Sequence, residues 1–270
     1  MTETATSFST IAALLAAGDL GEAVNAAGAA VKAKPTSAPA RILLAELLTL
    51  QGALERADTH LKLAADHAPP EFVGISQMRW LLRAAEARKN WYENASLPEF
   101  LDQPTERQQA TLQLALAIRD KDAATTQALR ENLEAAPLPE AAIDGAAPVP
   151  IRDACDLSQH GFEVLTLDGR YLWIAPEQIE NLRFQPIRRP RDRLWRPADT
   201  LLRDGRSAVF FVAAQYHDAA ATDPQRLGLE TDWVEELGGV ARGRGQRMIL
   251  ADENIHGLLH VSRIDFKDAA

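Results

Sequence analysis

A repeat of 34 residues in the first half of the chain constrains its fold more than any other feature. Gly18 and Gly52 are separated by 34 positions, as are Pro35 and Pro69. Four further matched pairs have the same spacing, namely Leu14 and Leu48, Leu20 and Leu54, Ala23 and Ala57, and Ala30 and Ala64. This period is typical of tetratricopeptide-like helical hairpins, which stack into a superhelix. An ordinary alanine-rich helical bundle is the alternative interpretation.

The repeat predicts paired helices separated by short turns. Gly18 lacks a Cβ atom and can turn the chain between the first two helices, and Pro35 ends the second. The third pair is degenerate, because one long helix replaces it. The expected helices are residues 8–16, 20–33, 38–50, 54–67, 71–89, 105–118 and 122–135.

A segment rich in proline follows the helical half. Residues 136–150 contain four prolines and one glycine, which cannot continue a helix. We therefore expect two domains joined by a linker. Residues 1–135 form the helical repeat domain, residues 136–150 the linker, and residues 151–270 a β-rich domain.

Short runs of β-branched and aromatic residues in the second half predict strands. Asp168-Gly169 and Asp204-Gly205 are favoured hairpin turns, and Pro176 suits the first position of a helical turn over 176–182. The expected strand pairs are 162–167 with 170–174, 195–202 with 208–216, and 247–251 with 258–266. We expect residues 238–245 to be a flexible loop. The predicted fold class is α+β, with a tetratricopeptide-like α–α superhelix followed by a mostly antiparallel β module, either a curved sheet or barrel-like, with short helices.

Charge and cysteine content exclude several classes of function. Acidic residues outnumber basic ones by 38 to 29, so general nucleic-acid binding is not expected. The single cysteine, Cys155, cannot form an intrachain disulfide, and Asp153 and Asp156 beside it predict a raised thiol pKa and an inert group. No apolar run reaches about 18 residues, and the N-terminus has no secretory pattern. We expect a cytoplasmic protein without membrane insertion.

The histidine-containing segment 256–260 has the spacing of a zinc-protease helix. Gly257, however, stands where that motif requires glutamate, and in a strand the two histidines would lie about 13 Å apart. The chain also lacks a nucleophile elbow and a phosphate-binding loop. We therefore expect no catalytic residue, no cofactor and no metal. A hydrolase using His256, His260 and Asp252 is the alternative.

Eight arginines and one tryptophan are concentrated between residues 183 and 206. Arginine and tryptophan are both enriched at protein interfaces. The candidate interface residues are Trp195, Arg188, Arg189, Arg191, Arg193 and Arg196. A solvated strand edge and a nucleic-acid site over Arg183–Arg206 are the alternatives. Tyr171, Trp173, Trp195 and Trp233 are expected to fill the core of the β module more than to form an interface.

Several short motifs, in order along the chain, resemble the ImpE family, also called SciE or TagJ. They are Asp168–Ile174, Pro176–Ile179, Leu194–Ala198, Thr231–Trp233, Gly245–Arg247 and Val261–Phe266, together with the pattern at residues 15–23. The resemblance covers nearly the whole chain. It implies a cytoplasmic accessory protein of bacterial type VI secretion, which binds the small sheath subunit through a helix near that subunit's N-terminus and modulates sheath assembly or recycling. It implies no catalytic residues.

The pattern of the residues by itself also favours a protein-binding function. An array of helical hairpins does not close on itself, so it leaves a surface that can accept a helix or an extended peptide. Such an array without a convincing catalytic set is more typical of an adaptor than of an enzyme.

Overall fold

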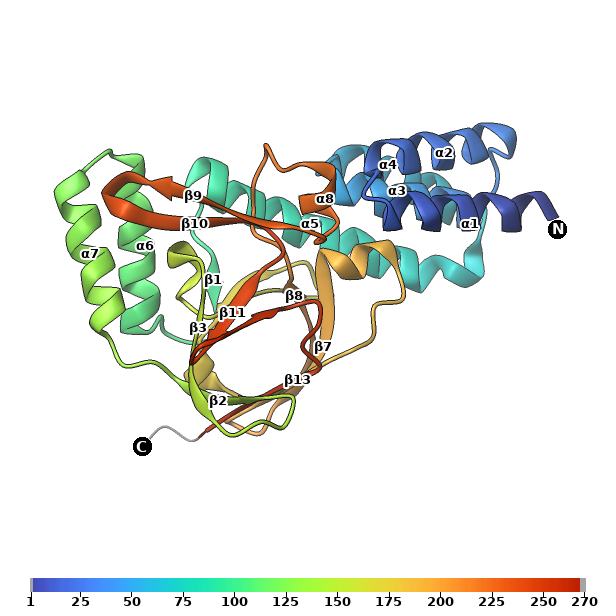
Figure 1. The fold of residues 1–270 in the computed structure, drawn as a ribbon. Coiled ribbons are helices and arrows are strands. Elements are labelled where there is room, and N and C mark those ends of the chain that lie inside the picture. Colours follow the sequence, from blue (N-terminus) through green and yellow to red (C-terminus); the bar gives the residue numbers. More distant parts are fainter. Residues whose placement is uncertain (1, 268–270) are drawn as a thin grey trace.

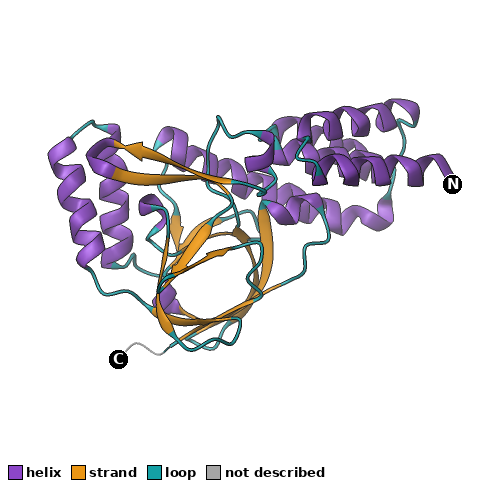
Figure 2. Ribbon diagram, in the orientation of Figure 1, coloured by secondary structure: helices purple, strands orange, loops and turns teal. Residues whose placement is uncertain are grey.

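Helices fill the first half of the chain and strands most of the second (Figures 1 and 2). The structure is a computed structural model that describes residues 2–267, with side chains over 9–68 and 70–267. The main helices are α1 (Thr2–Ala16), α2 (Leu20–Ala33), α3 (Ala38–Leu50), α4 (Leu54–Ala65), α5 (Phe72–Asn94), α6 (Glu106–Arg119) and α7 (Ala123–Ala135). The bounds of α2 and α3 are the predicted ones. None of the described helices is long and apolar enough to span a bilayer.

Local sequence signals fix the turns of the repeat. Gly18 and Gly52 have φ angles of +83° and +78°, a left-handed conformation that glycine adopts readily. Asp19 caps α2, because its side chain accepts a hydrogen bond from the backbone N–H of Glu22 at 2.9 Å. The two glycines therefore mark equivalent turns, one inside each helical hairpin, as the spacing predicts.

The helices α1 to α5 form one array in which each helix packs on the next. The first two hairpins are α1–α2 and α3–α4. The helix α5 packs on α4 and, on its other side, contacts strands β4 (Phe162–Leu165) and β5 (Tyr171–Ile174). The array therefore ends on a single long helix that also contacts the sheet.

One sheet of eleven strands dominates the second half of the described chain. The strand order is β1-β5-β4-β8-β7-β6-β13-β2-β3-β11-β12. The remaining strands of this sheet are β1 (Glu99–Phe100), β2 (Glu140–Ile143), β3 (Val149–Asp153), β6 (Ile179–Phe184), β7 (Trp195–Leu202), β8 (Ser207–Ala213), β11 (Met248–Ala251), β12 (Asn254–Gly257) and β13 (Arg263–Phe266). Every pairing is antiparallel except that of β1 with β5.

The sheet curls around an apolar core (Figure 1). Val164, Leu182 and Ile264 from three different strands are buried in this core. The curl stops short of a closed barrel, since β1 and β12 form its two edges and do not pair with each other. The predicted fold class, an α-helical repeat followed by a curved and mostly antiparallel sheet, is confirmed.

Short helices lie between the main elements. The short helix η1 (Pro69–Glu71) joins α4 to α5. Those between strands are η2 (Asp156–Ser158), η3 (Pro176–Gln178), η4 (Pro190–Arg193), α8 (Asp223–Arg226) and η5 (Leu237–Gly239). The helical turn predicted over 176–182 is shorter than expected, because η3 ends at Gln178 and residues 179–182 belong to β6. The hairpins predicted around Asp168-Gly169 and Asp204-Gly205 are β4–β5 and β7–β8.

The segment 136–150, expected to be a linker, contributes strand pairs to the sheet. Within it, β2 pairs with β13 and with the start of β3. Ala141 and Ile143 are buried there, so this stretch supplies core residues as well as a connection. The prolines excluded a helix correctly, but they lie at strand ends and edges, where proline is tolerated.

The strand pair predicted between residues 247–251 and 258–266 is wrong. The strand β11 pairs with β3 and β12, whereas β13 pairs with β2 and β6. A tight turn at Asp252, with a φ of +53°, forms the β11–β12 hairpin instead. The closest partner along the sequence is therefore β12, and β13 finds its partners far away in the chain.

Residues 238–245 are also different from the prediction of a flexible loop. Residues 240–245 form β10 (Val240–Gly245), which pairs over its whole length with β9 (Thr231–Glu236). Gly243 allows the ring of Tyr216 to lie against the strand, since a Cβ atom there would come within 2.2 Å of that ring. Tertiary packing thus overrides the low strand propensity of a glycine- and arginine-rich stretch.

Helices α6 and α7 lie apart from the array (Figure 1). Leu114 and Leu133 of this helical hairpin form a small apolar cluster with Val240 of β10. The most extensive contacts of α6 and α7 are with each other, with η2 and η5, and with β10. Arg119 of α6 also donates to the carbonyl oxygens of Trp91 and Tyr92 near the end of α5. The array described by the repeat is therefore α1–α5, and α6–α7 supports the β9–β10 hairpin.

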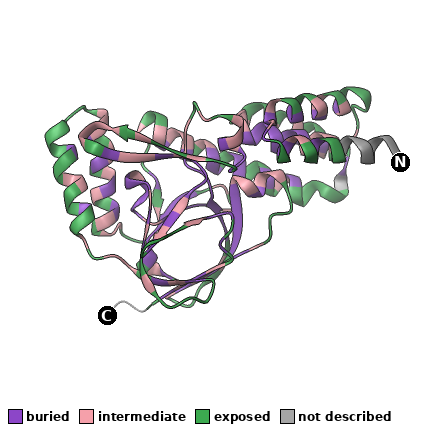
Figure 3. Cartoon of the chain, viewed as in Figure 1, coloured by how far each residue is buried: buried purple, intermediate pink, exposed green. Residues whose placement is uncertain are grey.

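The array and the sheet share one apolar core. Leu81 and Trp91 of α5 are buried in the same cluster as Leu165 and Trp173 of the β4–β5 hairpin. The Trp91 and Trp173 rings meet edge to face, with centroids 5.2 Å apart. Buried positions run continuously from the helices into the strands (Figure 3). This shared core fixes how the two halves are joined.

Candidate functional site

The junction between the array and the sheet is built around a buried ion pair. Arg88 of α5 donates from Nε to Oε1 of Glu163 at 3.0 Å and from Nη2 to Oε2 at 2.8 Å. Both side chains are buried. Burial alone would raise the pKa of Glu163, but the attraction of Arg88 outweighs it and holds that pKa well below its ordinary value. Glu163 is therefore a fixed negative charge.

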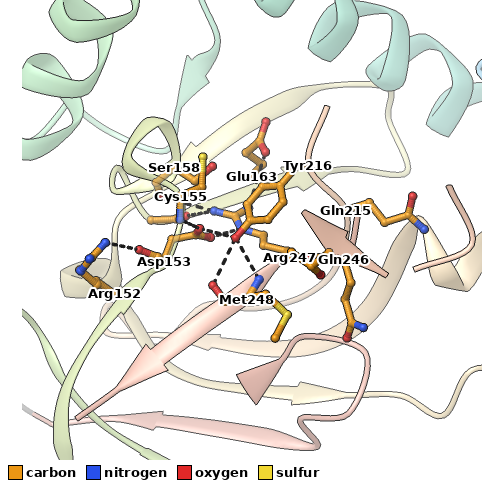
Figure 4. A network of polar contacts seen from close by, with 12 residues as sticks. Arg152, Asp153, Cys155, Ser158, Glu163, Gln215, Tyr216, Gln246, Arg247 and Met248 are labelled. Carbon is orange, nitrogen blue, oxygen red and sulfur yellow. Dashed lines mark hydrogen bonds and ion pairs between the residues drawn. The ribbon is translucent and has the colours of Figure 1, made fainter. Parts of the chain in front are cut away.

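A second buried arginine neutralises the other side of the site (Figure 4). Arg247 donates to the Asp153 carboxylate and, from Nη2, to the carbonyl oxygen of Gly161 at 2.7 Å. Its Nη1 lies 3.6 Å from Oε2 of Glu163. The hydroxyl of Tyr216 donates to Oδ1 of Asp153 at 2.8 Å. We call Arg88, Asp153, Glu163, Tyr171, Tyr216 and Arg247 the buried network. Its two arginines and two acids balance in charge.

The network joins elements far apart in the sequence. Tyr171 donates to Glu163, and the indole N–H of Trp173 donates to the Tyr171 hydroxyl at 2.7 Å. Arg88 also donates to the backbone carbonyl of Gln215 at 3.0 Å. A charged group that is buried and fully paired holds its neighbours in one arrangement, because breaking any contact leaves an unpaired charge. The chemistry of this cluster is therefore structural.

His160 lies beside the network and is completely buried. Its ring stacks on that of Trp173, with centroids 3.5 Å apart and planes 12° apart. Burial lowers its pKa to about 3, with the charges of Arg247 and Arg88 acting in the same direction against that of Glu163. The ring is neutral and enclosed, so it has no route to a substrate.

Cys155 is inert, as the acidic neighbours predict. Burial, with a further contribution from Asp153, raises the pKa of its thiol to about 12. The side chain is almost fully enclosed. A protonated and enclosed thiol is a poor nucleophile and a poor metal ligand.

A segment around α8 attaches the sheet to the turns of the repeat. We call residues 217–230 the strap. Asp223 accepts a hydrogen bond from the backbone N–H of Gly21 at 2.7 Å, and so caps the start of α2. Arg226 donates from Nη1 to the carbonyl oxygen of Gln51 at 2.8 Å, at the end of α3. The strap therefore contacts both of the equivalent repeat turns.

A polar cleft of about 250 Å³ lies between the strap, α5 and the end of α3. Among the residues lining it are Lys89, Glu93, His217 and Asp218. The ring of His217 stacks on that of Tyr92, with centroids 4.7 Å apart, and burial lowers its pKa to about 4. The charges of this cleft are paired within the chain, since Asp218 binds Arg242 and Glu93 lies 4.0 Å from Lys89.

A wider groove of about 780 Å³ runs between α4 and α5. Asp58 of α4 forms an ion pair with Lys62 of the same helix at 2.9 Å and with Arg79 of α5 at 2.6 Å. Trp80 is 42% exposed, and the guanidinium of Arg83 lies 5.4 Å from the centre of its ring. This groove combines an exposed aromatic ring with charged walls, which is the composition of a protein-docking surface.

The structure removes Trp195 and Arg196 from the predicted interface. Trp195 is buried in the core shared by the array and the sheet. Arg196 is buried and donates at 2.6 Å to each of the carbonyl oxygens of Leu258 and Val261. Neither side chain is available to a partner on this surface.

The other predicted arginines divide into two groups. Arg191 and Arg193 make contacts within the chain, Arg191 with Met78 and Glu46 and Arg193 with the carbonyl of Leu227. The short helix η4 that carries Arg191 packs on α3. Arg188 and Arg189 are exposed, and Arg189 also lies 3.6 Å from Glu46. The cluster thus lies largely at an interface inside the molecule, and an external role for Arg188 and Arg189 stays a prediction.

Two further arginines of this segment also make contacts within the chain, which argues against a nucleic-acid site over Arg183–Arg206. Arg203 donates to the carbonyl of Phe266, and Arg206 pairs with Asp204. Of the four aromatic residues expected in the core, Tyr171, Trp173 and Trp195 are buried, and Trp233 is 40% exposed.

The alternative hydrolase residues lie around the β11–β12 hairpin. Asp252 is exposed in its turn, His256 is half-buried on β12, and His260 is exposed beyond it. Over residues 2–267, no group of three or more His, Cys, Asp or Glu side chains is arranged to hold a metal ion.

Sequence reasoning missed the buried network and the strap. Arg88, Glu163 and Arg247 are single charged residues in amphipathic surroundings, and nothing in their spacing marks them as partners. No sequence motif singles out residues 219–226, yet Asp223 and Arg226 of this segment hold the repeat turns. The Thr222–Gln225 capping box was the one local signal of an ordered element there.

Two family comparisons agree with this division of the chain. The tetratricopeptide repeat family matches residues 14–72, which cover most of the array. The family described as "ImpE protein" matches residues 145–265. We call residues 145–265 the ImpE domain after this match. The family resemblance inferred from the sequence motifs is thereby confirmed.

Two individual proteins resemble the whole chain, including the ImpE domain. The type VI secretion system accessory component TagJ of Pseudomonas aeruginosa is 28% identical over 257 residues, covering 94% of this chain and 90% of that protein. A crystal structure of protein VPA1032 from Vibrio parahaemolyticus has a TM-score of 0.85 at 23% identity, covering 96% of this chain and 98% of the other. The second comparison shows that the ImpE domain and the array share the fold of that protein.

Proposed function

We propose that this chain is a non-catalytic accessory protein of bacterial type VI secretion that acts in the cytoplasm. The observation that carries the proposal is the joint occurrence of a tetratricopeptide-like array and an ImpE domain, in a chain similar over 94% of its length to an accessory component of that system. The partner we propose is the small subunit of the contractile sheath, bound through a helix near that subunit's N-terminus. Binding would modulate sheath assembly or recycling.

The proposal is supported by what the array offers. Stacked helical hairpins leave grooves between neighbouring helices, and such grooves accept the apolar face of an amphipathic helix. The groove between α4 and α5 has this form. The shared core and the buried network hold it in a fixed position relative to the ImpE domain.

A non-catalytic role is supported by the state of the reactive side chains. The thiol of Cys155 is protonated and enclosed, and the ring of His160 is neutral and enclosed. Glu163 and Asp153 are each bound to a buried arginine. These groups are occupied in holding the fold together, which leaves them unsuited to proton transfer.

Co-purification with the small sheath subunit tests the proposal. The full chain is expressed with the tagged subunit, with and without the subunit's N-terminal helix. We expect the intact subunit to retain the chain and the truncated subunit to lose it. Equal retention by both would disprove helix docking, and retention by neither would disprove the choice of partner.

A further inference from the structure

The array ends on a helix without the partner that the repeat would supply. The first two hairpins, α1–α2 and α3–α4, are complete, and α5 occupies the first position of a third. The next helix along the chain, α6, packs mainly on α7 and η2, and its Arg119 reaches α5 only near the end of that helix, at Trp91 and Tyr92. Because helical repeats bury their apolar faces on their neighbours, a missing partner leaves part of α5 uncovered.

Large apolar side chains are exposed on α4 and α5, and one of them, Trp80, lines the groove between these helices. Phe72 is 57% exposed and Val73 67%, both in the first turn of α5. Trp80 follows two turns later, and Leu63 near the end of α4 is also exposed. Four of the exposed large hydrophobic residues in the described chain therefore lie on this one pair of helices. Exposed apolar groups concentrated in one place mark an interaction surface.

The groove between α4 and α5 has the shape for one further helix. The residues that line it are spaced three and four apart on each helix, as on one face: Asp58, Thr59 and Lys62 on α4, and Ser76, Arg79 and Trp80 on α5. The β4–β5 turn lies against Trp80, since a Cβ atom at Gly169 would come within 2.7 Å of the Trp80 ring. An occupant that covers Trp80 would therefore lie next to the sheet as well as the array.

The charges of the groove indicate the chemistry of its occupant. Asp58 is already neutralised by Lys62 and Arg79. Arg83 lies over the Trp80 ring, and no acidic side chain in the described part of the chain forms an ion pair with it. An amphipathic helix with an acidic residue beside its apolar stripe would cover Trp80 and pair with Arg83. A basic or wholly polar helix would not.

We propose that the α4–α5 groove binds such a helix from a partner protein, which takes the place of the missing second helix of the third hairpin. This inference rests on the proposed function, under which the occupant is the N-terminal helix of the small sheath subunit. It adds to that function the location of the binding site and the two residues that recognise the partner helix, Trp80 and Arg83.

The test measures binding of a fluorescent synthetic peptide of that N-terminal helix to the full chain. The variant Trp80→Ala is compared with Trp233→Ala, which removes the same side chain at nearly equal exposure, 40% against 42%, from β9. We expect Trp80→Ala to weaken binding by about tenfold or more, and Trp233→Ala to change it by less than about twofold. Circular dichroism confirms that both variants are folded.

A charge exchange provides the second variant, because Trp80 also packs on the β4–β5 turn. Arg83→Glu should weaken binding, and a peptide in which the acidic residue facing Arg83 is replaced by lysine should restore it. If the wild-type chain binds the peptide and all these variants bind equally well, the groove is the wrong site while the proposed function stands. If the wild-type chain does not bind, both fail. If Trp80→Ala instead dissociates a dimer of the chain, the occupant is a second copy and the inference is overturned.

Discussion

Arg88 and Glu163, 75 positions apart in the sequence, form a bidentate ion pair that is almost fully removed from solvent. One residue belongs to the last helix of the array and the other to β4, at the centre of the contact between the two halves. The pair therefore acts as a joint. It makes the position of the array depend on a contact that neither half can satisfy alone.

Breaking this joint on one side should be costly. Arg88→Met leaves Glu163 buried with Arg247 as its only cationic partner, and we expect the free energy of unfolding to fall by about 3–5 kcal/mol. Urea denaturation followed by circular dichroism measures the change. The matched control is Arg170→Met, which breaks an ion pair with Glu99 whose side chains are 47% and 53% exposed. That change should cost less than about 1 kcal/mol. Equal costs for the two variants would contradict the assignment of a joint.

His160 should make stability depend on pH. Its pKa is lowered to about 3 by burial, against about 6.5 in an unfolded chain. The unfolded state therefore binds a proton that the folded state rejects, so the contribution of His160 is complete above about pH 6.5 and is lost as pH falls toward 3. Inside that window the free energy of unfolding should fall by up to about 1.4 kcal/mol per pH unit from this group.

The variant His160→Phe tests this sign, since phenylalanine can keep the stack on Trp173 without titrating. Unfolding by urea is measured at several pH values between 7 and 5, above the range in which carboxylates dominate. We expect the free energy of unfolding of the variant to depend less steeply on pH than that of the wild type. Part of the remaining slope comes from His217, whose pKa is also lowered, to about 4. His260→Gln, at an exposed position, serves as control and should keep the wild-type slope. Parallel curves for His160→Phe and the wild type would refute the prediction.

The local parts of this fold could be predicted from the sequence. The 34-residue spacing of Gly18 and Gly52 gave the repeat turns, and the bounds of α2 and α3 followed from caps and prolines. Asp168-Gly169 gave the β4–β5 hairpin. In each case the deciding interaction lies within a few residues along the chain, where propensity and turn chemistry act.

The remaining parts depend on contacts between distant segments. The strand β13 pairs with β6 and β2, and residues 240–245 become a strand because β9 and Tyr216 lie beside them. Burial of Trp195 and Arg196 is likewise set by elements far along the chain. The sequence alone does not show whether an arginine binds backbone carbonyls inside the molecule or is exposed to a partner protein.

The strap should stabilise the turns of the helical repeat. Replacing Asp223 with alanine removes the acceptor for the N–H of Gly21 and leaves that donor at the start of α2 without its partner. We expect the exchange of the Gly21 amide with deuterium to accelerate and the free energy of unfolding to fall by about 1 kcal/mol. Glu180→Ala, on an exposed position of β6, should leave that exchange unchanged. Protection of Gly21 that persists in Asp223→Ala would show that the strap does not hold the turn.

A comparison of alanine variants in the two Asp-Gly turns of the sheet distinguishes the energetic cost of backbone strain from the cost of crowding at the groove. Gly169 and Gly205 have nearly the same φ, +87° and +85°, so alanine at either position incurs a similar cost for the left-handed conformation, about 1–2 kcal/mol. A Cβ atom at Gly205 meets nothing within 4 Å, whereas one at Gly169 comes within 2.7 Å of the Trp80 ring. Gly169→Ala should therefore be the more destabilising by about 1–3 kcal/mol, measured by urea unfolding. The double variant Gly169→Ala, Trp80→Ala should recover the packing part of this loss and leave only the strain. If Gly169→Ala and Gly205→Ala cost the same, the β4–β5 turn does not press on Trp80, and the contact assigned between this turn and the α4–α5 groove is lost.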